Sequence, residues 1–340
     1  MAADRLSRWF AAQTDLSLAE LVAPVRTAGI GGATGVIDVD GGPVFVKRIP
    51  ITRRELAEPG GTANVFGLPL YCQYGVGRPS FNVWRELVAS QAVSGSDHFP
   101  ALYHWRVLPG RPPSTVGQMG SGAGSGRGSG RGSGRGSGSG SGSGAHPGAA
   151  ARAIRRRWEE LAAAPAGLVL FFEHIRYPLL EWLDADPLGR VETLEQQLAE
   201  IVEVLREQQL LHMDGHFDNM RSDGRRIYLT DFGLATSPRF ELSEAERDFA
   251  ARHTGHDADY ASMRLVNWIV TRLRNVPVPA VGGPVERNEY VRRCAEGDIP
   301  PGPGAAVLAR HAAAAARMND LYWKLFGGDV DARYSSEGSS

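Results

Sequence analysis

The chain contains 340 residues, of which 42% are hydrophobic and 22% are charged, and this composition is ordinary for a globular protein. The formal net charge is −1, so no overall field would attract nucleic acid or an anionic membrane. The length is sufficient for one large domain, or for two smaller domains that share a cleft.

The cysteines and the hydrophobic segments give an expectation of where the protein works. Cys72 and Cys294 lie far apart without metal-ligand spacing, so we expect no disulfide framework and a cytoplasmic location. No apolar run reaches the length of about 18 residues that a membrane-spanning helix needs. Residues 1–21 mix charged and apolar side chains, which predicts one amphipathic surface helix and not a signal peptide.

The residues before position 110 predict a strand-rich region. Residues 35–40 and 44–49 are apolar or alternating, and the turn sequence at 40–43 joins them, which is typical of a β-hairpin. Residues 82–93 carry an apolar stripe at helical spacing and predict a helix. Residues 100–108 predict a further strand.

A run of glycine, serine and arginine from Gly117 to Gly144 interrupts this region. Such a composition cannot bury enough apolar surface to offset the entropy of ordering, so we expect residues 117–150 to form a disordered insertion. An RNA-contacting arginine-glycine segment is the alternative, but only Arg127, Arg131 and Arg135 are charged within the run. We therefore expect a flexible insertion that binds no nucleic acid.

The residues after the insertion return to regular structure. Residues 150–164 predict a helix, and we interpret its basic run, Arg155 to Arg157, as a solvated face. Residues 167–172 are continuously apolar and predict a short buried strand.

Two capping boxes mark helix starts in the second half of the chain. One is formed by Thr193 and Gln196 and the other by Ser243 and Glu246. The first predicted helix has an apolar stripe that faces a core, and this stripe comprises Leu194, Leu198, Ile201, Val202 and Leu205.

The order of these elements predicts an α+β fold with two lobes. We place a β-rich N-terminal lobe at residues 1–175, interrupted by the insertion, and a helical C-terminal lobe at residues 176–330. Residues 331–340 are expected to form a flexible tail.

Two short motifs carry the functional information. His212-x-Asp214-x-x-x-x-Asn219 is followed by Asp231-Phe-Gly, and 17 positions separate Asp214 from Asp231. This pair resembles the catalytic loop and the DFG segment of the protein-kinase-like superfamily. The resemblance extends over about residues 29–268 without the insertion, and it implies a bilobal fold that binds ATP and Mg²⁺ between its lobes.

The residue types suit phosphoryl transfer. A carboxylate must accept or orient the proton of the attacking hydroxyl, and the resemblance gives this role to Asp214. Mg²⁺ prefers oxygen ligands, and Asn219 and Asp231 would supply an amide oxygen and a carboxylate. Gly233 would give the backbone freedom to turn after the metal ligand.

The resemblance also implies a lysine in an early strand. Lys47 ends the sequence Val-Phe-Val-Lys, which is similar to the strand whose lysine holds the α- and β-phosphates in this superfamily. Its ion-pair partner is expected on the following helix, where Glu86 is the first choice. Glu55 is the alternative because it lies nearer in the sequence, and the interval from Lys47 to Glu86 is longer than usual.

A glycine-rich segment precedes the predicted hairpin and would offer backbone N–H groups to phosphate. The strict superfamily pattern requires glycine where Thr34 stands, so a simple glycine-rich turn is the alternative. The glycines of this segment are Gly29, Gly31, Gly32 and Gly35.

The resemblance places the adenine contact after the strand at 167–172. There the Glu173 carbonyl and the Ile175 amide are expected to bind the edge of the base.

Position 216 separates the branches of the superfamily. Members that act on proteins usually have lysine two residues after the catalytic aspartate, whereas this chain has His216. His-x-Asp-x-His-x-x-Asn is similar to the aminoglycoside-phosphotransferase and choline-kinase branch. No Ala-Pro-Glu follows Asp231, and the next helix is predicted near Ser243. We therefore expect phosphorylation of a small hydroxylated molecule, with no obligate protein partner.

Two alternative functions stay open, a divergent serine/threonine protein kinase and a pseudokinase scaffold that only binds nucleotide. An acidic group near the second capping box would attract an amine-bearing acceptor, although an acidic helix N-terminus explains it equally well. We interpret His253 and His256 as helix-end polar residues and not as a metal site. The acidic group comprises Glu241, Glu244, Glu246, Asp248, Asp257 and Asp259.

Overall fold

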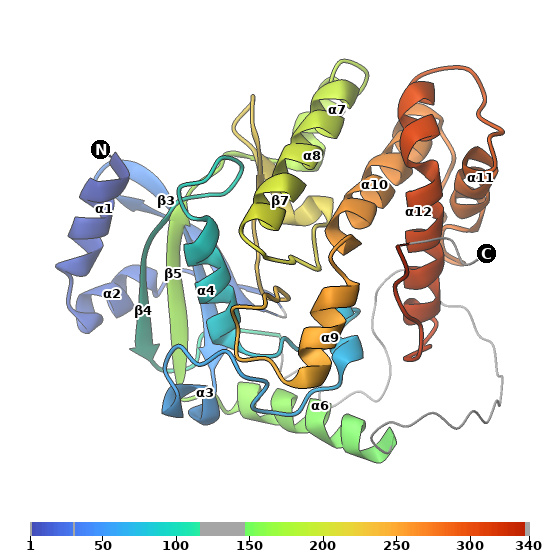
Figure 1. Ribbon diagram of the computed structural model, residues 1–340. Coiled ribbons are helices and arrows are strands. Elements are labelled where there is room, and N and C mark those ends of the chain that lie inside the picture. The colour runs from blue at the N-terminus through green and yellow to red at the C-terminus, as the bar shows by residue number, and fades with distance from the viewer. Residues whose placement is uncertain (1, 30, 116–146, 337–340) are drawn as a thin grey trace.

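The computed structural model describes residues 2–29, 31–115 and 147–336 (Figure 1). The protein is a mixed α+β structure with an antiparallel sheet in its N-terminal region and helices in its C-terminal part. The predicted insertion at Gly117–Gly144 lies outside the described residues. Its predicted end at residue 150 is wrong, because helix α6 begins at Pro147.

The N-terminal sheet has the strand order β1-β2-β3-β5-β4, and every neighbouring pair in it is antiparallel. The predicted hairpin is confirmed, since β2 and β3 meet at a two-residue turn where Asp40 and Gly41 both have positive φ, 55° and 79°. The strands are β1 (Thr27–Gly29), β2 (Gly32–Val39), β3 (Gly42–Ile51), β4 (Leu102–Pro109) and β5 (Ala166–Glu173).

The two faces of the sheet pack against different helices. On one face Val46 and Phe171 pack with Phe10, which α1 carries. On the other face Ile51 and Leu170 pack with Trp84. This alternation follows from the two-residue period of side chains along a strand. The helices around the sheet are α1 (Ala2–Ala11), α2 (Asp15–Val22), α3 (Arg53–Ala57), α4 (Val83–Val93) and α6 (Pro147–Ala162).

The C-terminal part is built from helices around a second core, with a small antiparallel sheet of order β6-β7-β8. Helices α10, α11 and α12 pack together at the opposite end of the molecule from α1 (Figure 1). The helices are α7 (Leu179–Asp184), α8 (Val191–Glu207), α9 (Glu244–Arg252), α10 (His256–Trp268), α11 (Val285–Ala295) and α12 (Ala305–Phe326). The short elements are η1 (Leu70–Tyr74), β6 (Tyr177–Pro178), η2 (Phe217–Asn219), β7 (Met220–Ser222), β8 (Ile227–Leu229) and the π-helix η3 (Ile269–Leu273).

Most of the predicted element types are confirmed, and the errors concern helix starts. The helix predicted for residues 1–21 is two helices, because the Thr14 side chain accepts a hydrogen bond from the Ser17 amide and caps α2. The capping box at Thr193 is wrong, since α8 already begins at Val191. The box at Ser243 is confirmed, with both of its hydrogen bonds present.

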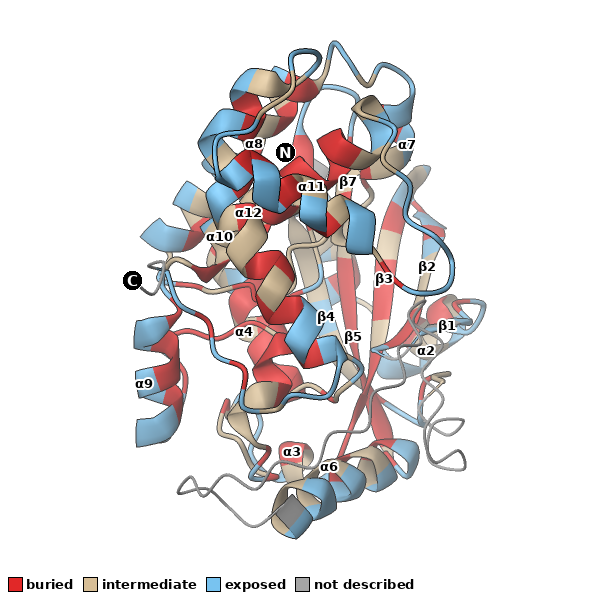
Figure 2. Ribbon diagram, turned by 90° about the vertical axis from the view of Figure 1, so that its right-hand side faces the viewer, coloured by how far each residue is buried: buried red, intermediate tan, exposed pale blue. Residues whose placement is uncertain are grey.

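The basic run on α6 is only partly solvated. Arg155 and Arg156 are exposed, as predicted, but Arg157 is 1% exposed and its Nη2 lies 2.8 Å from Oε1 of Glu55. Exposed and intermediate stretches alternate along α6 in Figure 2. Interpreting the whole run as a solvated face was therefore wrong. A one-residue change of position moves a side chain by about 100° around a helix, so neighbours in a charged run meet different surroundings.

Both cysteines are buried and free. Within the described ranges, no helix is long and apolar enough to cross a membrane.

Candidate active site

A cavity of about 250 Å³ lies between the N-terminal sheet and the C-terminal part. Lys47 and Glu86 line it from the N-terminal region, and Asn219 and Asp231 line it from the C-terminal part. Its remaining wall is largely apolar and includes Phe45, Phe172 and Leu229. The cavity therefore combines apolar surface with charged groups of both signs, which suits a ligand that is part apolar and part polar.

The charged end is organised by Lys47, on β3. Its Nζ lies 2.6 Å from Oε1 of Glu86 and 2.8 Å from Oδ1 of Asp231, and Lys47 is only 6% exposed. Burial disfavours the ammonium, but the two carboxylates outweigh burial and raise the pKa of Lys47. The lysine is therefore a permanent cation at neutral pH. The alternative partner Glu55 is excluded, because that carboxylate binds Arg157 instead.

Asp231 holds its position through backbone geometry. Its φ is 68°, an uncommon value for a non-glycine residue, and its Oδ1 also accepts a hydrogen bond from the Gly233 amide at 3.3 Å. Burial opposes ionisation, yet Lys47 and this amide hold the pKa of Asp231 below its usual value. The carboxylate is therefore charged, and its side chain is 42% exposed.

Gly233 has a different role from the predicted one. The positive φ occurs at Asp231 and not at Gly233. A Cβ at position 233 would lie 3.2 Å from Oδ1 of Asp231 and 3.5 Å from Oε2 of Glu86. The glycine is needed because two carboxylates approach its backbone closely.

Hydrogen bonds from three directions hold the loop that contains Asp214. The Asp214 amide donates to Nδ1 of His212 at 3.2 Å, and Nε2 of His212 lies 3.1 Å from the Thr230 carbonyl. Burial lowers the pKa of His212, so the ring is neutral and donates through Nε2. Asp257, on α10, accepts hydrogen bonds from the amides of His212 and Met213 at 2.6 and 3.0 Å. No local sequence signal identified Asp257 as an anchor of this loop.

Asp214 is a carboxylate whose pKa is raised into the neutral range. Burial, reinforced by the negative charge of Asp231, raises the pKa of Asp214 to about 7. Nδ2 of Asn219 donates to the carbonyl oxygen of Asp214 at 3.0 Å and to its Oδ2 at 3.3 Å. Nε2 of His216 lies 3.7 Å from Oδ1 of Asp214, and burial lowers the pKa of His216. His216 is thus a neutral imidazole beside Asp214.

Asn219 and Asp231 fit the requirements of a hard cation. Both line the same cavity, and the Nδ2 group of Asn219 faces Asp214, which leaves its amide oxygen for another ligand. Among the described residues, no group of three or more His, Cys, Asp or Glu could hold a metal. Mg²⁺ needs no such group, because it commonly takes one or two protein oxygens together with substrate phosphates and water.

The glycine-rich segment forms the turn between β1 and β2, where Gly29 is paired with Gly32. A Cβ at Gly31 would lie 4.0 Å from Cε of Lys47, so the turn passes over the lysine. Gly32 has a φ of 129°, and a Cβ there would lie 2.1 Å from the Arg48 carbonyl oxygen. This glycine is therefore required by packing. At Gly35 a Cβ would lie 3.2 Å from the side chain of Val25, a tight contact.

The segment after β5 lines the opposite end of the cavity. Glu173 and Ile175 both face the cavity, as expected from the sequence. The Glu173 amide donates to the Ala101 carbonyl at 2.9 Å, and the Ile175 carbonyl accepts from Nε of Arg221 at 2.6 Å. Arg221 also lines the cavity, and sequence analysis did not identify it.

Most carboxylates of the acidic group near α9 bind other residues of the protein, which favours the structural interpretation of this group over an open wall. Glu246 pairs with Arg85 at 2.6 Å, and Oε2 of Glu241 accepts from the Thr62 amide at 2.8 Å. Asp257 holds the catalytic-type loop, and Asp259 pairs with Arg317 at 3.2 Å. These four carboxylates are bound by other residues, while Glu244 and Asp248 are exposed on α9.

The two histidines beside this group are buried. Nε2 of His253 forms a hydrogen bond of 2.6 Å with the Tyr74 hydroxyl, and Nδ1 of His256 lies 3.1 Å from Oδ1 of Asp257. These contacts agree with the interpretation of both residues as structural.

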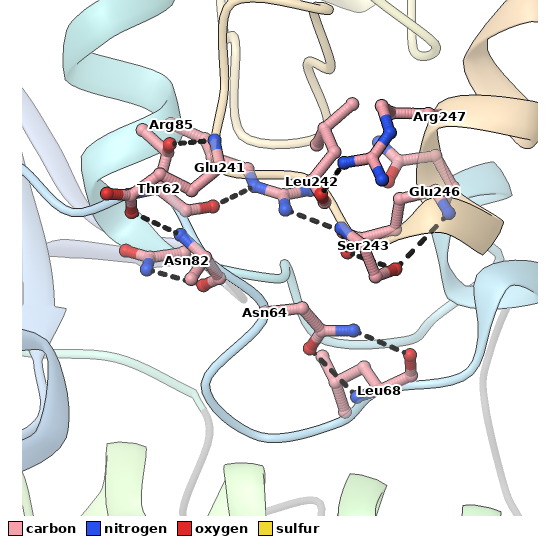
Figure 3. A network of polar contacts seen from close by, with 12 residues as sticks. Thr62, Asn64, Leu68, Asn82, Arg85, Glu241, Leu242, Ser243, Glu246 and Arg247 are labelled. Carbon is pink, nitrogen blue, oxygen red and sulfur yellow. Dashed lines mark hydrogen bonds and ion pairs between the residues drawn. The ribbon is translucent and has the colours of Figure 1, made fainter.

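A polar network holds helix α4, which carries Glu86 (Figure 3). Arg85 is 1% exposed, and it donates from Nε to the Thr62 carbonyl at 2.7 Å and from Nη2 to Glu246. Asn82 donates to the carbonyls of Gly61 and Ala63, each at 2.9 Å. The segment between Lys47 and Glu86 thus contacts the N-terminal end of α4, and Arg85 connects this helix to α9.

No protein-family model matches the chain, and no curated protein is significantly similar to it in sequence.

The network predicts that Arg85 is important for stability. Replacing Arg85 with methionine leaves Glu246 buried without its partner, which should lower the free energy of unfolding by about 3–5 kcal/mol. Urea denaturation measures this. Arg310→Met is the matched control, because it breaks an ion pair with Glu195 on an exposed arginine and should cost about 1 kcal/mol or less. Equal losses in both variants would contradict the importance of the buried pair.

Proposed function

We propose that the protein is an ATP-dependent phosphotransferase of the protein-kinase-like superfamily, with a β-rich N-terminal lobe and a helical C-terminal lobe. The observation that carries the proposal is the position of Lys47, which lies within 2.8 Å of carboxylates from both parts of the chain. Glu86 and Asp231 hold this cation at the charged end of the cavity. A cation in that place would bind the phosphates of a nucleotide.

The cavity offers a complementary surface for each part of ATP. Phe45, Phe172 and Leu229 would pack against adenine, and the backbone of residues 173–175 would bind its edge. Gly31 lies close to Lys47, so the glycine-rich segment would offer backbone N–H groups to the phosphates. Mg²⁺, held by Asn219 and Asp231, would neutralise charge that develops on the phosphoryl group.

Asp214 would accept the proton of the acceptor hydroxyl. Its pKa of about 7 suits a general base, because the ideal pKa of a catalytic base lies near the working pH. Asn219 would orient this carboxylate through its hydrogen bond to Oδ2. At position 216 this chain has a neutral histidine, whereas superfamily members that act on proteins usually have a lysine there.

The segment after Asp231 supports a small acceptor. Thr236 forms a bridge with Leu211, and α9 begins at Glu244, so few residues are available as a platform for a peptide. A divergent serine/threonine protein kinase is the second candidate. A pseudokinase scaffold is less well supported, because it would have no need for the carboxylate at Asp214. The proposal includes a cytoplasmic location. It includes no partner other than ATP and the acceptor, and in particular no nucleic acid.

Asp214→Asn should lower kcat by about 10²–10⁴-fold while ATP affinity changes little, because the base is lost but the nucleotide contacts are retained. The measurement is transfer of labelled phosphate to hydroxylated small molecules and, in parallel, to generic protein substrates. Asp248→Asn is the matched control, since Asp248 is an exposed carboxylate of α9 that is not among the residues lining the cavity. Label only on protein would contradict the small-molecule acceptor, and equal rates for wild type and Asp214→Asn would contradict the role of the base.

The raised pKa of Asp214 predicts a pH dependence. The carboxylate form is active, so kcat should rise about tenfold per pH unit below pH of about 7 and level off above it. A pH–rate profile at saturating Mg²⁺ and ATP measures this. The residual activity of Asp214→Asn should lack the acidic limb, and a wild-type kcat that does not change over this range would refute the assignment.

A further inference from the structure

Among the described residues that line the candidate cavity, the one arginine is Arg221, on β7. Its neighbours Met220 and Ser222 are buried, whereas Arg221 is partly buried. Because successive side chains of a strand point to opposite faces, the arginine lies on the other face of β7 from these two residues. There it lines the same cavity as Glu173 and Ile175, which belong to the segment where the adenine base is expected.

The guanidinium of Arg221 binds the backbone of the segment after β5. Its Nε donates to the Ile175 carbonyl at 2.6 Å, and its Nη2 donates to the Arg176 carbonyl at 3.0 Å. In the small sheet, β7 pairs with β6, and Arg221 stands opposite Pro178. The side chain therefore extends the contact between β7 and this segment beyond the end of β6. Hydrogen bonds from a charged donor are strong, so both carbonyls are held toward the guanidinium.

These bonds determine which backbone groups of residues 173–175 can bind a ligand. The Glu173 amide donates to the Ala101 carbonyl at 2.9 Å, and the Ile175 carbonyl accepts from Arg221. Among the described residues, none accepts a hydrogen bond from the Ile175 amide. A second donor approaching the Ile175 carbonyl would lie against the N–H groups of the guanidinium. Ile175 therefore offers its amide to a base, and Arg221 guards its carbonyl.

This arrangement distinguishes purines by the group at C2 of the ring. The Ile175 amide is a donor, so on the edge of adenine it would bind N1, and C2 is the next ring atom. The Ile175 carbonyl would lie beside C2, because the N–H and C=O of one extended residue face the same side. Adenine carries only hydrogen at C2, whereas guanine and 2-aminoadenine carry an amino group. That amino group would meet the N–H groups of Arg221, donor against donor.

We propose that Arg221 makes the nucleotide site selective against purines with an amino group at C2, guanine among them. This inference rests on the proposed function. Arg221 sets specificity and takes no part in phosphoryl transfer. A donor that is buried without an acceptor costs more than a typical hydrogen bond contributes, so the discrimination comes from the unfavourable contact and not from an extra bond to adenine.

Two diphosphates that differ by one amino group test the inference, ADP and 2-aminoadenosine diphosphate. Binding of each to the full chain is measured by calorimetry in the presence of Mg²⁺. We expect wild type to bind ADP about 10- to 100-fold more tightly, which corresponds to the cost of one unpaired donor. GDP should bind at least as weakly as 2-aminoadenosine diphosphate, because it carries the same amino group.

Arg221→Met removes the guanidinium and keeps an unbranched side chain. The freed Ile175 carbonyl can then accept from the C2 amino group, so 2-aminoadenosine diphosphate should bind at least as tightly as ADP. Arg225→Met is the matched control, because Arg225 is an exposed arginine between β7 and β8 that is not among the residues lining the cavity. The control should retain the wild-type preference. Urea denaturation checks that each variant is folded, and Arg221→Gln replaces Arg221→Met if the latter is not.

Equal affinity of wild type for ADP and 2-aminoadenosine diphosphate would overturn the inference, as would a wild-type preference that persists in a folded Arg221 variant. Loss of both diphosphates by a folded variant would also overturn it, because the arginine would then hold the segment in place without discriminating between bases. A wild-type chain that binds no diphosphate would refute the proposed function, on which the inference rests. The expected preference without any phosphoryl transfer would refute the transferase activity alone and leave the selectivity of the site in place.

Discussion

Lys47 is a buried ammonium, and a buried charge is tolerated only where opposite charges and hydrogen bonds replace water. Its two partners come from α4 and from the segment after β8, so three regions distant in sequence must meet at one point. Lys47 on the sheet is neutralised only if α4 holds Glu86 beside it and the segment after β8 holds Asp231 beside it. Satisfying this cation is therefore one constraint on how the two parts of the protein meet.

The position of α4 in turn depends on further buried pairs. Arg85 connects the helix to Glu246 of the C-terminal part, and Glu55 accepts a hydrogen bond from the Val83 amide at its N-terminus. Arg157, from α6, neutralises Glu55. Each pair is costly to break on one side only, so the pairs act as specific constraints on where the helix lies. The long segment between β3 and α4 provides the residues that make this possible.

Charge is distributed unevenly around the candidate base. Carboxylates of α9 and α10 bind arginines or backbone amides, while Arg264 contacts an aromatic ring. Burial and the negative charge of Asp231 raise the pKa of Asp214, and Asn219, Lys47 and Arg264 oppose this rise.

The sequence alone determined the features that depend on a few neighbouring residues: the hairpin at Asp40-Gly41, the capping box at Ser243 and the spacing between Asp214 and Asp231. Turn geometry, side-chain period and capping are local, so they can be predicted from local composition. Only the tertiary structure decided that Glu86 and not Glu55 binds Lys47, that Arg157 is buried, that the strained backbone lies at Asp231 and not at Gly233, and that most of the acids near α9 are engaged. Burial and charge pairing depend on residues up to 184 positions apart, and no local pattern specifies which of several nearby charges will meet.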